Sequence, residues 1–327
     1  MKDDNSCDGS AKALLEAVGK ELAKSVSAPA RAAGAAIAKR YPGSAVLFYG
    51  AAADDPDGEA ARGNALYDFY IIAPSYRGAY EQKRLRVLNR LLPPNVFYFE
   101  TPYEDVILRA KYAVLSAGHF ERLCGAKTFH SYFWGRFAQP SRIIHAPDAM
   151  RAQIERSIAA AVATFCRRAA GLTFDEFTPH DLWRAGLRAS YRSELRAEKT
   201  DRAETVLARY DGWPERVTAP ALAASGLAVA TAGDGRLLVS PKPARLPVQT
   251  AWIARSVFGG FLSAARLLKA TTTFHGGLEY ILWKIERHAG VRLQATDWQR
   301  RHPMLAAPGL ALRYYIERAK TARKRGA

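Results

Sequence analysis

The sequence predicts an α/β domain followed by a mostly helical unit and a basic helical C-terminal tail. In the first 145 residues short β-rich runs alternate with helical segments, whereas helical periodicity dominates the next hundred. From Pro241 to the end the chain carries 16 Lys and Arg against 4 Asp and Glu. We therefore expect an α/β domain over 1–145, a helical domain over 146–246 and a basic tail over 247–327.

The α/β domain is predicted from alternating short runs. Residues 11–40 have helical spacing and end before Pro42-Gly43. Strands are expected at 45–49, 66–73, 96–100 and 111–116, and a helix at 80–92. Together these elements predict a sheet of about four or five strands.

The second domain is predicted to be helical with one hairpin. Helices are expected at 148–170, 178–189 and 191–210, the second beginning with Thr178 as N-cap and Pro179 at the first position. Apolar runs flank Gly233-Asp234-Gly235, which predicts a hairpin resembling the wing of a winged-helix domain. The Pro-rich residues 241–247 would then form a linker.

The composition favours a folded protein of a reducing compartment. The chain has 327 residues, 49% of them hydrophobic, which is enough for a sizeable core. Cys7, Cys124 and Cys166 have no metal-ligand spacing and cannot all pair. No run approaches the roughly 20 apolar residues of a spanning helix, and neither a signal peptide nor an Arg-rich presequence is evident. We expect a soluble or peripheral protein of a bacterial cytoplasm.

Asp68 lies inside the apolar run 66–72, where an unpaired carboxylate is costly. The preceding apolar run ends in a turn at Gly50. In nucleotidyltransferases a turn after the first strand approaches the nucleotide phosphates, and acids on the next strand hold Mg²⁺. The pattern therefore indicates a metal–nucleotide site, although an ordinary turn glycine and an Asp–Arg ion pair explain the same residues.

Three further clusters are candidates for the site, and two of them carry side chains suited to phosphate binding. Lys111 lies near the start of an apolar strand, and Arg136 follows Gly135 in an aromatic run. Glu194 and Glu198 are four residues apart and share a helix face. Each cluster has a structural alternative: an edge lysine, aromatic packing and a charged surface, respectively.

Taken in order, these motifs resemble the mitochondrial-type phosphatidate cytidylyltransferases, the translocator assembly and maintenance family of CDP-diacylglycerol synthases. The likeness covers about residues 40 to 215. The motifs that carry it are Phe48-Tyr49-Gly50, Asp68-Phe69, Lys111-Tyr112-Ala113-Val114-Leu115-Ser116, Tyr132 with Gly135-Arg136 and Gln139-Pro140, Phe177-Thr178, Ser190-Tyr191 and Glu194-Leu195-Arg196.

The resemblance implies a nucleotidyltransferase-fold domain, a winged-helix-like domain and a membrane-associating C-terminal helix. The implied reaction joins CTP and phosphatidic acid into CDP-diacylglycerol and pyrophosphate, with Mg²⁺. In the implied site Gly50 and Ala51 lie under the triphosphate, Asp68 holds the metal, and Lys111 and Arg136 neutralise phosphate charge. The residues implied to face this site from the second domain are Tyr191, Glu194 and Arg196.

Two positions depart from the family pattern. Ala51 stands where the family has serine, which removes a hydroxyl donor to phosphate. Tyr70 stands where nucleotidyltransferases usually carry a second acid. Glu100, at the end of the next strand, is the carboxylate we expect to complete the metal site, although an exposed strand end would explain it equally well.

The tail is suited to a membrane surface, because the net charge of +17 is concentrated there. Residues 257–269 and 281–285 combine apolar, aromatic and basic side chains, as interfacial helices do, although packing on the protein's own core would give the same pattern. The aromatics accompany aliphatic residues, which favours an anionic membrane over nucleic acid as the partner. We expect a peripheral protein on the cytoplasmic face of the inner membrane.

Three hypotheses follow for the function. The first is the lipid cytidylyltransferase, and the second is a nucleotidyltransferase that acts on RNA or a soluble acceptor. The third is a non-catalytic relative that binds nucleotide or lipid and has lost metal chemistry through Ala51 and Tyr70.

Overall fold

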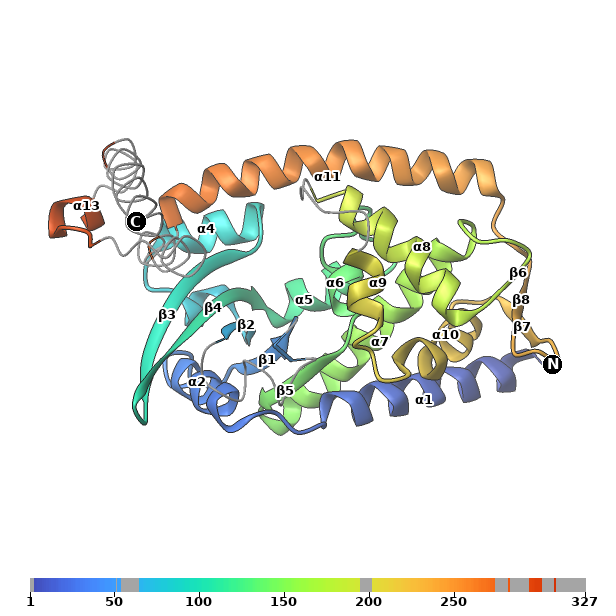
Figure 1. Ribbon diagram of the computed structural model, residues 1–327, viewed down its shortest axis with the longest axis horizontal. Coiled ribbons are helices and arrows are strands. Elements are labelled where there is room, and N and C mark those ends of the chain that lie inside the picture. The colour runs from blue at the N-terminus through green and yellow to red at the C-terminus, as the bar shows by residue number, and fades with distance from the viewer. Residues whose placement is uncertain are drawn as a thin grey trace, which may run out of the picture.

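The fold was described from a computed structural model (Figure 1). The structure describes residues 3–50, 52–53, 65–194, 202–273, 282, 294–301 and 309.

A five-stranded mixed sheet forms the first part of the fold. Its strands are β1 (Ala45–Tyr49), β2 (Leu66–Ala73), β3 (Asn95–Tyr103), β4 (Val106–Ser116) and β5 (Ser141–His145). Their order is β3-β4-β2-β1-β5; β2 and β4 are parallel and the other pairs are antiparallel. The mixed α/β character and the four predicted strands are thus confirmed, with β3 and β4 longer than the patterns indicated.

The sheet is buried on both faces, because successive side chains of a strand point to opposite sides. Val46 and Phe48 pack with Ile37 of α2 (Ala28–Ala38). Leu47 and Tyr70 point to the other face and belong to the core shared with the helical part. The short helices beside the sheet are α3 (Tyr76–Ala79), α4 (Lys83–Leu91), α5 (Ala117–Cys124) and α6 (Trp134–Phe137).

The helical part contains α1 (Asp3–Leu22), α7 (Asp148–Ala170), α8 (Pro179–Arg192), α9 (Arg202–Leu207) and α10 (Trp213–Ala224). A small antiparallel sheet lies at its edge, with β6 (Glu176–Phe177), β7 (Ala228–Thr231) and β8 (Leu237–Ser240) in the order β6-β8-β7. The predicted hairpin is therefore confirmed as β7 and β8. The predicted Thr178 cap is also confirmed: its hydroxyl accepts a hydrogen bond from the Asp181 backbone N–H at 3.1 Å.

Two predicted helices differ from the structure. The segment 11–40 forms two helices, α1 and α2, separated by residues 23–27, and Pro29 follows at the start of the second. The helix expected over 191–210 is not continuous, because α8 ends at Arg192 and turn residues follow it.

The long helix α11 (Arg245–Thr273) lies across both parts of the molecule (Figure 1). At its first half, Ser256 donates a hydrogen bond to the Arg192 carbonyl at the end of α8, at 3.0 Å. At its second half, Lys269 donates to the carbonyls of Leu92 and Pro94, between α4 and β3, at 2.5 and 2.6 Å. A Cβ on Gly259 would collide with the Ser193 carbonyl, so glycine permits this close approach.

The remaining described helix is α13 (Asp297–Arg301). No helix among the described residues is long and apolar enough to cross a membrane. The run 281–285 lies outside the described residues except for position 282.

Candidate functional site

The candidate site is built on a row of residues that crosses the five-stranded sheet. In the strand register Asp68 lies opposite Lys111 on one side and Tyr49 on the other, and Tyr98 lies opposite Lys111. Residues two positions apart on a strand share a face, so Tyr70 lies on the face of Asp68. This face is the one turned toward the helical part.

Asp68 and Lys111 form an ion pair between β2 and β4. Asp68 Oδ1 and Lys111 Nζ are 2.9 Å apart, and their side chains are 28% and 32% exposed. Asp68 Oδ1 is enclosed but accepts no hydrogen bond of good geometry from the described residues, so charge attraction holds the pair. A partly exposed carboxylate and ammonium thus meet at the surface of the sheet.

Gly50 brings the turn after β1 against this pair. Its φ of +84° is in the left-handed region that favours glycine, and a Cβ placed on it would lie 3.7 Å from Asp68 Oδ2. The predicted proximity of the Gly50 turn to Asp68 is therefore present. Ala51, the next residue of that turn, lies outside the described residues.

Arg136, on α6, is held beside the same face by residues of two segments. Its Nη1 donates to the Tyr70 hydroxyl and its Nη2 to Glu194 Oε2, each at 3.1 Å. The guanidinium also lies 4.4 Å from the centroid of the Tyr132 ring and 5.8 Å from that of Tyr49. Since Tyr49 is opposite Asp68 in the register, the Arg136–Glu194 pair and the Asp68–Lys111 pair belong to one site.

Burial and charge make Arg136 a firmly cationic group. Burial would lower its pKa, but Tyr132, Tyr70 and Glu194 together raise the pKa of Arg136 well above its usual value. Burial also opposes ionisation of Tyr132, yet the guanidinium groups of Arg136 and Arg266 outweigh it and lower the pKa of Tyr132.

Tyr70 occupies the position where nucleotidyltransferases usually carry a second acid. Its side chain is fully buried and its hydroxyl accepts the hydrogen bond from Arg136. Burial raises the pKa of Tyr70 well above its usual range, so the phenol is neutral at physiological pH. The position therefore supports Arg136 and supplies no second carboxylate.

Tyr191 supports the site from behind Arg136. Its hydroxyl donates to Gln139 Oε1 at 3.3 Å, as does that of Tyr210 at 2.8 Å, and Gln139 Nε2 donates to the Gly135 carbonyl at 2.8 Å. Tyr191 and Glu194 thus reach the site from the end of α8, in the helical part. Arg196, the third residue expected there, lies outside the described residues.

Glu100 is not brought beside Asp68. It lies on β3 opposite Arg109, and its Oε1 binds Arg109 Nε at 3.2 Å and the Tyr98 hydroxyl at 2.7 Å. Strand β4 separates β3 from β2, and neighbouring strands are about 4.8 Å apart, so the backbones of Glu100 and Asp68 are roughly 10 Å apart. Glu100 is thus held by Arg109 and Tyr98 in the structure, and its role as a second metal ligand stays a prediction.

Asp68 is the carboxylate of this site that we expected to hold Mg²⁺, whereas Glu194 is paired with Arg136. The described residues contain no group of three His, Cys, Asp or Glu side chains placed to hold an ion. Mg²⁺ is nevertheless commonly held by one or two carboxylates together with substrate phosphates and water. Asp68, partly exposed beside the Gly50 turn, fits this second arrangement.

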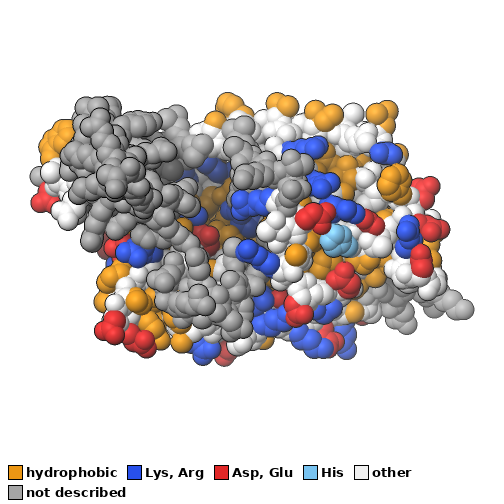
Figure 2. Space-filling model, in the orientation of Figure 1, with side chains coloured by type: hydrophobic (Ala, Val, Ile, Leu, Met, Phe, Trp, Pro, Cys, Tyr) orange, Lys and Arg blue, Asp and Glu red, His pale blue; other side chains and the backbone are white. Residues whose placement is uncertain are grey.

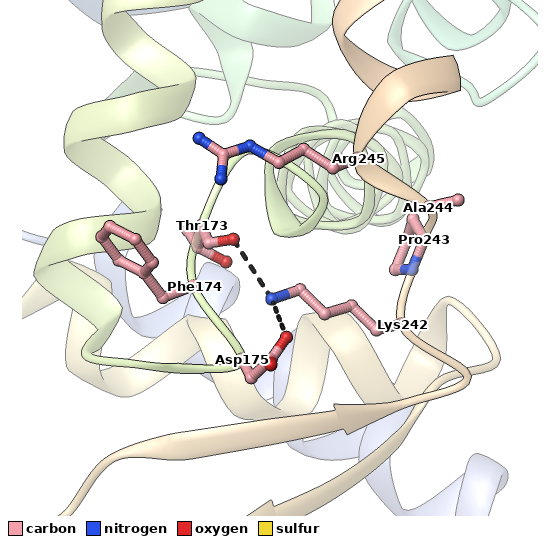
Figure 3. Close-up of a pocket in the computed structure, with 7 residues that line it drawn as sticks. All are labelled: Thr173, Phe174, Asp175, Lys242, Pro243, Ala244 and Arg245. Carbon is pink, nitrogen blue, oxygen red and sulfur yellow. Dashed lines mark hydrogen bonds and ion pairs between the residues drawn. The ribbon is translucent and has the colours of Figure 1, made fainter.

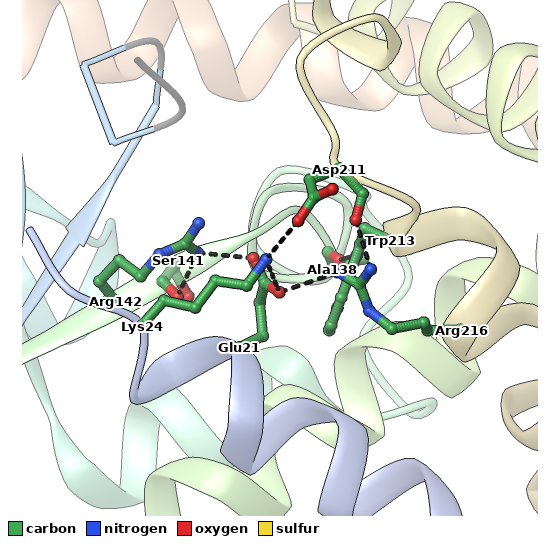
Figure 4. A network of polar contacts seen from close by, with 8 residues as sticks. All are labelled: Glu21, Lys24, Ala138, Ser141, Arg142, Asp211, Trp213 and Arg216. Carbon is green, nitrogen blue, oxygen red and sulfur yellow. Dashed lines mark hydrogen bonds and ion pairs between the residues drawn. The ribbon is translucent and has the colours of Figure 1, made fainter. Parts of the chain in front are cut away.

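A cavity of about 260 Å³ adjoins the turn after β1. The residues that line it are Glu21, Lys24, Ser25, Ala53, Pro140, Arg142, Arg209, Tyr210 and Asp211. In Figure 4 the buried Glu21 carboxylate is surrounded by cations: Arg142 at 2.7 Å, Lys24 at 2.9 Å and Arg216 at 3.1 Å. We did not predict this network, although Glu21 interrupts the apolar face of α1 formed by Leu14, Val18 and Leu22, and that interruption was its signal.

A second cavity, of about 350 Å³, lies at the start of α11 (Figure 3). Lys242 Nζ crosses it to the Thr173 carbonyl at 3.1 Å and to Asp175 Oδ1 at 3.0 Å. None of the predicted site residues lines it.

The chain matches no family model and no curated protein. The geometry above is therefore the basis for assigning a function.

Proposed function

We propose that this chain is a Mg²⁺-dependent phosphatidate cytidylyltransferase that forms CDP-diacylglycerol and pyrophosphate from CTP and phosphatidic acid at a membrane surface. One observation carries the proposal: Gly50, Asp68 and Lys111 meet on one face of the sheet, and Arg136 and Glu194 join them there. These residues come from five separate segments, so their meeting is a property of the fold.

The arrangement suits a reaction between two anions. An oxygen of the lipid phosphate attacks the α-phosphorus of CTP, a new P–O bond forms, and the bond to the bridging oxygen of pyrophosphate breaks. A phosphate monoester carries about −1.5 to −2 charges at neutral pH, so the attacking oxygen needs no general base. Lys111 and Arg136 offset the charge that the two substrates bring together, and the site positions them.

Asp68 is the residue we assign to Mg²⁺, which when bound neutralises charge on the triphosphate. The Gly50–Ala51 turn would lie under that triphosphate, as the sequence resemblance implies. Tyr191 and Glu194 would close the site from the helical part, where they fix Gln139 and Arg136. The mixed sheet and the helical part with a hairpin are compatible with a nucleotidyltransferase domain joined to a winged-helix-like domain.

The outer face of α11 supports a membrane location. Leu246, Ile253, Val257 and Phe261 are spaced by seven, four and four residues and are 65–73% exposed. In Figure 2 hydrophobic side chains follow the edge of the molecule along which α11 runs. An exposed apolar stripe on a helix of a basic protein is typical of binding to an anionic bilayer, on the cytoplasmic side in this proposal.

A second candidate is a non-catalytic protein that binds nucleotide or lipid at the same site. Two observations favour it. The carboxylate of Asp68 is paired with Lys111, and Tyr70 stands where a second carboxylate would be. A site of this kind would retain the cations and would lack turnover.

The test is the fate of CTP labelled at either the α- or the γ-phosphate, with Mg²⁺ and liposomes that contain phosphatidic acid. We expect the α-label in an organic-soluble product and the γ-label in pyrophosphate, both dependent on phosphatidic acid. Folded, liposome-bound protein that yields no product with any of the four nucleotides would favour the second candidate. A labelled product with RNA or a soluble acceptor alone would favour a different acceptor.

A further inference from the structure

A second, partly buried arginine from α11, Arg266, lies beside Arg136. The guanidinium carbon of Arg266 is 4.1 Å from the centroid of the Tyr132 ring, and that of Arg136 is 4.4 Å from the same centroid. The two cations therefore share one aromatic ring. Figure 2 shows Lys and Arg side chains gathered below α11, around a recess between the sheet and the helical part.

The charges around this ring do not balance. Arg136 is paired with Glu194, whereas Arg266 donates through Nε to a neutral acceptor, the Pro93 carbonyl, at 2.8 Å. Among the described residues the two Nη groups of Arg266 make no hydrogen bond or ion pair. His130, which also lies near Arg266, adds no negative charge. The cluster thus holds two guanidinium groups for one carboxylate.

Such a surplus is unfavourable in the absence of an anion. Burial lowers the pKa of Arg266, and the positive charge of Arg136 adds to this effect. A buried cation without a partner costs more than a paired one. Arginine presents a planar fork of donors that matches phosphate oxygens, and the free Nη groups of Arg266 are the donors available for such a contact.

The position of Arg266 on α11 connects this surplus with the lipid substrate. Nine residues separate Arg266 from the exposed Val257, which places them on opposite sides of a helix with 3.6 residues per turn. The same helix therefore carries an apolar stripe on its outer face and a phosphate-binding side chain on its inner face. A lipid whose acyl chains remain in the bilayer would meet both.

We propose that Arg266 and Arg136 together bind a phosphate monoester, and that this group is the headgroup of the lipid acceptor. The inference rests on the proposed function. A phosphate monoester presents three unesterified oxygens and about −1.5 to −2 charges to the two guanidinium groups, whereas a phosphodiester lipid presents two such oxygens and a single charge. Arg266 is thereby a determinant of specificity for phosphatidic acid.

The test compares binding of the full chain to liposomes that contain either phosphatidic acid or phosphatidylglycerol, at matched surface charge. The wild type should prefer phosphatidic acid, and R266Q should lose about tenfold of that affinity, the size of a charge-assisted hydrogen bond. R266K keeps the positive charge and a donor toward the Pro93 carbonyl but lacks the planar pair of guanidinium donors. It should fold, and it should lose part of the preference for phosphatidic acid. R255Q is the matched control, because Arg255 is a buried guanidinium of the same helix that donates through Nε to the Phe129 carbonyl at 2.9 Å.

Four results would overturn the inference: equal binding of the two lipids by the wild type, an unchanged preference in R266Q, an equal loss in R255Q, or a loss of CTP affinity in place of phosphatidic acid affinity. The last result would assign the phosphate to the nucleotide. A preference that depends on Arg266 in a protein without turnover would keep this inference and contradict the proposed reaction, so the two failures are distinguishable.

Discussion

Arg136 is the residue on which the two parts of the site depend most. It is buried, and Glu194 is the carboxylate that pairs with it, at 3.1 Å. E194Q keeps the shape of the side chain but removes the charge, so we expect the free energy of unfolding to fall by about 3 kcal/mol. Urea denaturation would measure this change.

E100Q is the matched control for that substitution. Glu100 pairs with Arg109 at 3.2 Å on an exposed part of the sheet, where an ion pair contributes about 0–1 kcal/mol. Equal losses in E194Q and E100Q would show that burial does not decide the cost, contrary to our account of Arg136.

His130 provides a pH-dependent test of the cluster around Arg266. Burial and the nearby charge of Arg266 lower the pKa of His130 to about 4. The unfolded chain, with a histidine pKa near about 6.5, then binds more protons than the folded one, so stability is lost as the pH falls from about 6.5 to 4. Thermal unfolding of wild type and H130F across this range should show a smaller acid loss in H130F. Identical pH profiles would contradict this assignment.

At single positions the sequence identified candidate site residues but not the contacts between them. Gly50, Asp68, Lys111, Arg136 and Glu194 were all identified from short motifs, and the structure brings them to one face. The contact between Tyr70 and Arg136 joins residues 66 positions apart and has no local signal.

Glu100 illustrates the same limit. It was expected at the end of a strand but lies inside β3, which continues to Tyr103, and its position relative to Asp68 depends on which strands are neighbours. That order is fixed by long-range pairing and burial, which a local pattern does not contain.

Among the elements, α11 has an apolar outer face, with Ile253 and Phe261 exposed and without a partner within the described structure. If that face binds a bilayer, I253E and F261E should each weaken sedimentation with anionic liposomes severalfold, because a charge at the interface opposes apolar burial. I107E is the control, since Ile107 is an exposed apolar residue on β4, away from α11. Unchanged sedimentation of both α11 variants would contradict the membrane role of this face.

Elements with a strong local signal were predicted well. The predicted bounds of β1, β2 and α7 agree with the structure, because apolar runs or helical periodicity ended at clear turn residues. Helix α10 was missed, because Pro220 lies inside it and interrupts the helical pattern. Residues 195–201, which the predicted helix includes, lie outside the described residues.

At the scale of the whole molecule, segments distant in the sequence are packed together. Leu14, Val18 and Leu22 of α1 share a core with α7 and α10, although the sequence assigned α1 to the first domain. The start of the predicted tail is also structural, since Trp252 of α11 is buried and donates to the Arg168 carbonyl at 3.0 Å. Removing residues 250–327 would therefore disturb the fold, and single substitutions on the outer face test membrane binding more cleanly.

The central claim is that Asp68 belongs to a site for nucleotidyl transfer. The most direct measurement is transfer of the α-phosphate label of CTP to lipid by wild type, D68N and D175N, with liposome binding recorded in the same samples. D175N is the control, because Asp175 also pairs with a lysine, Lys242, at 3.0 Å, but lines the cavity at the start of α11, which none of the predicted site residues lines. We predict that D68N loses turnover and keeps liposome binding, while D175N keeps both. Full activity of D68N would contradict the claim.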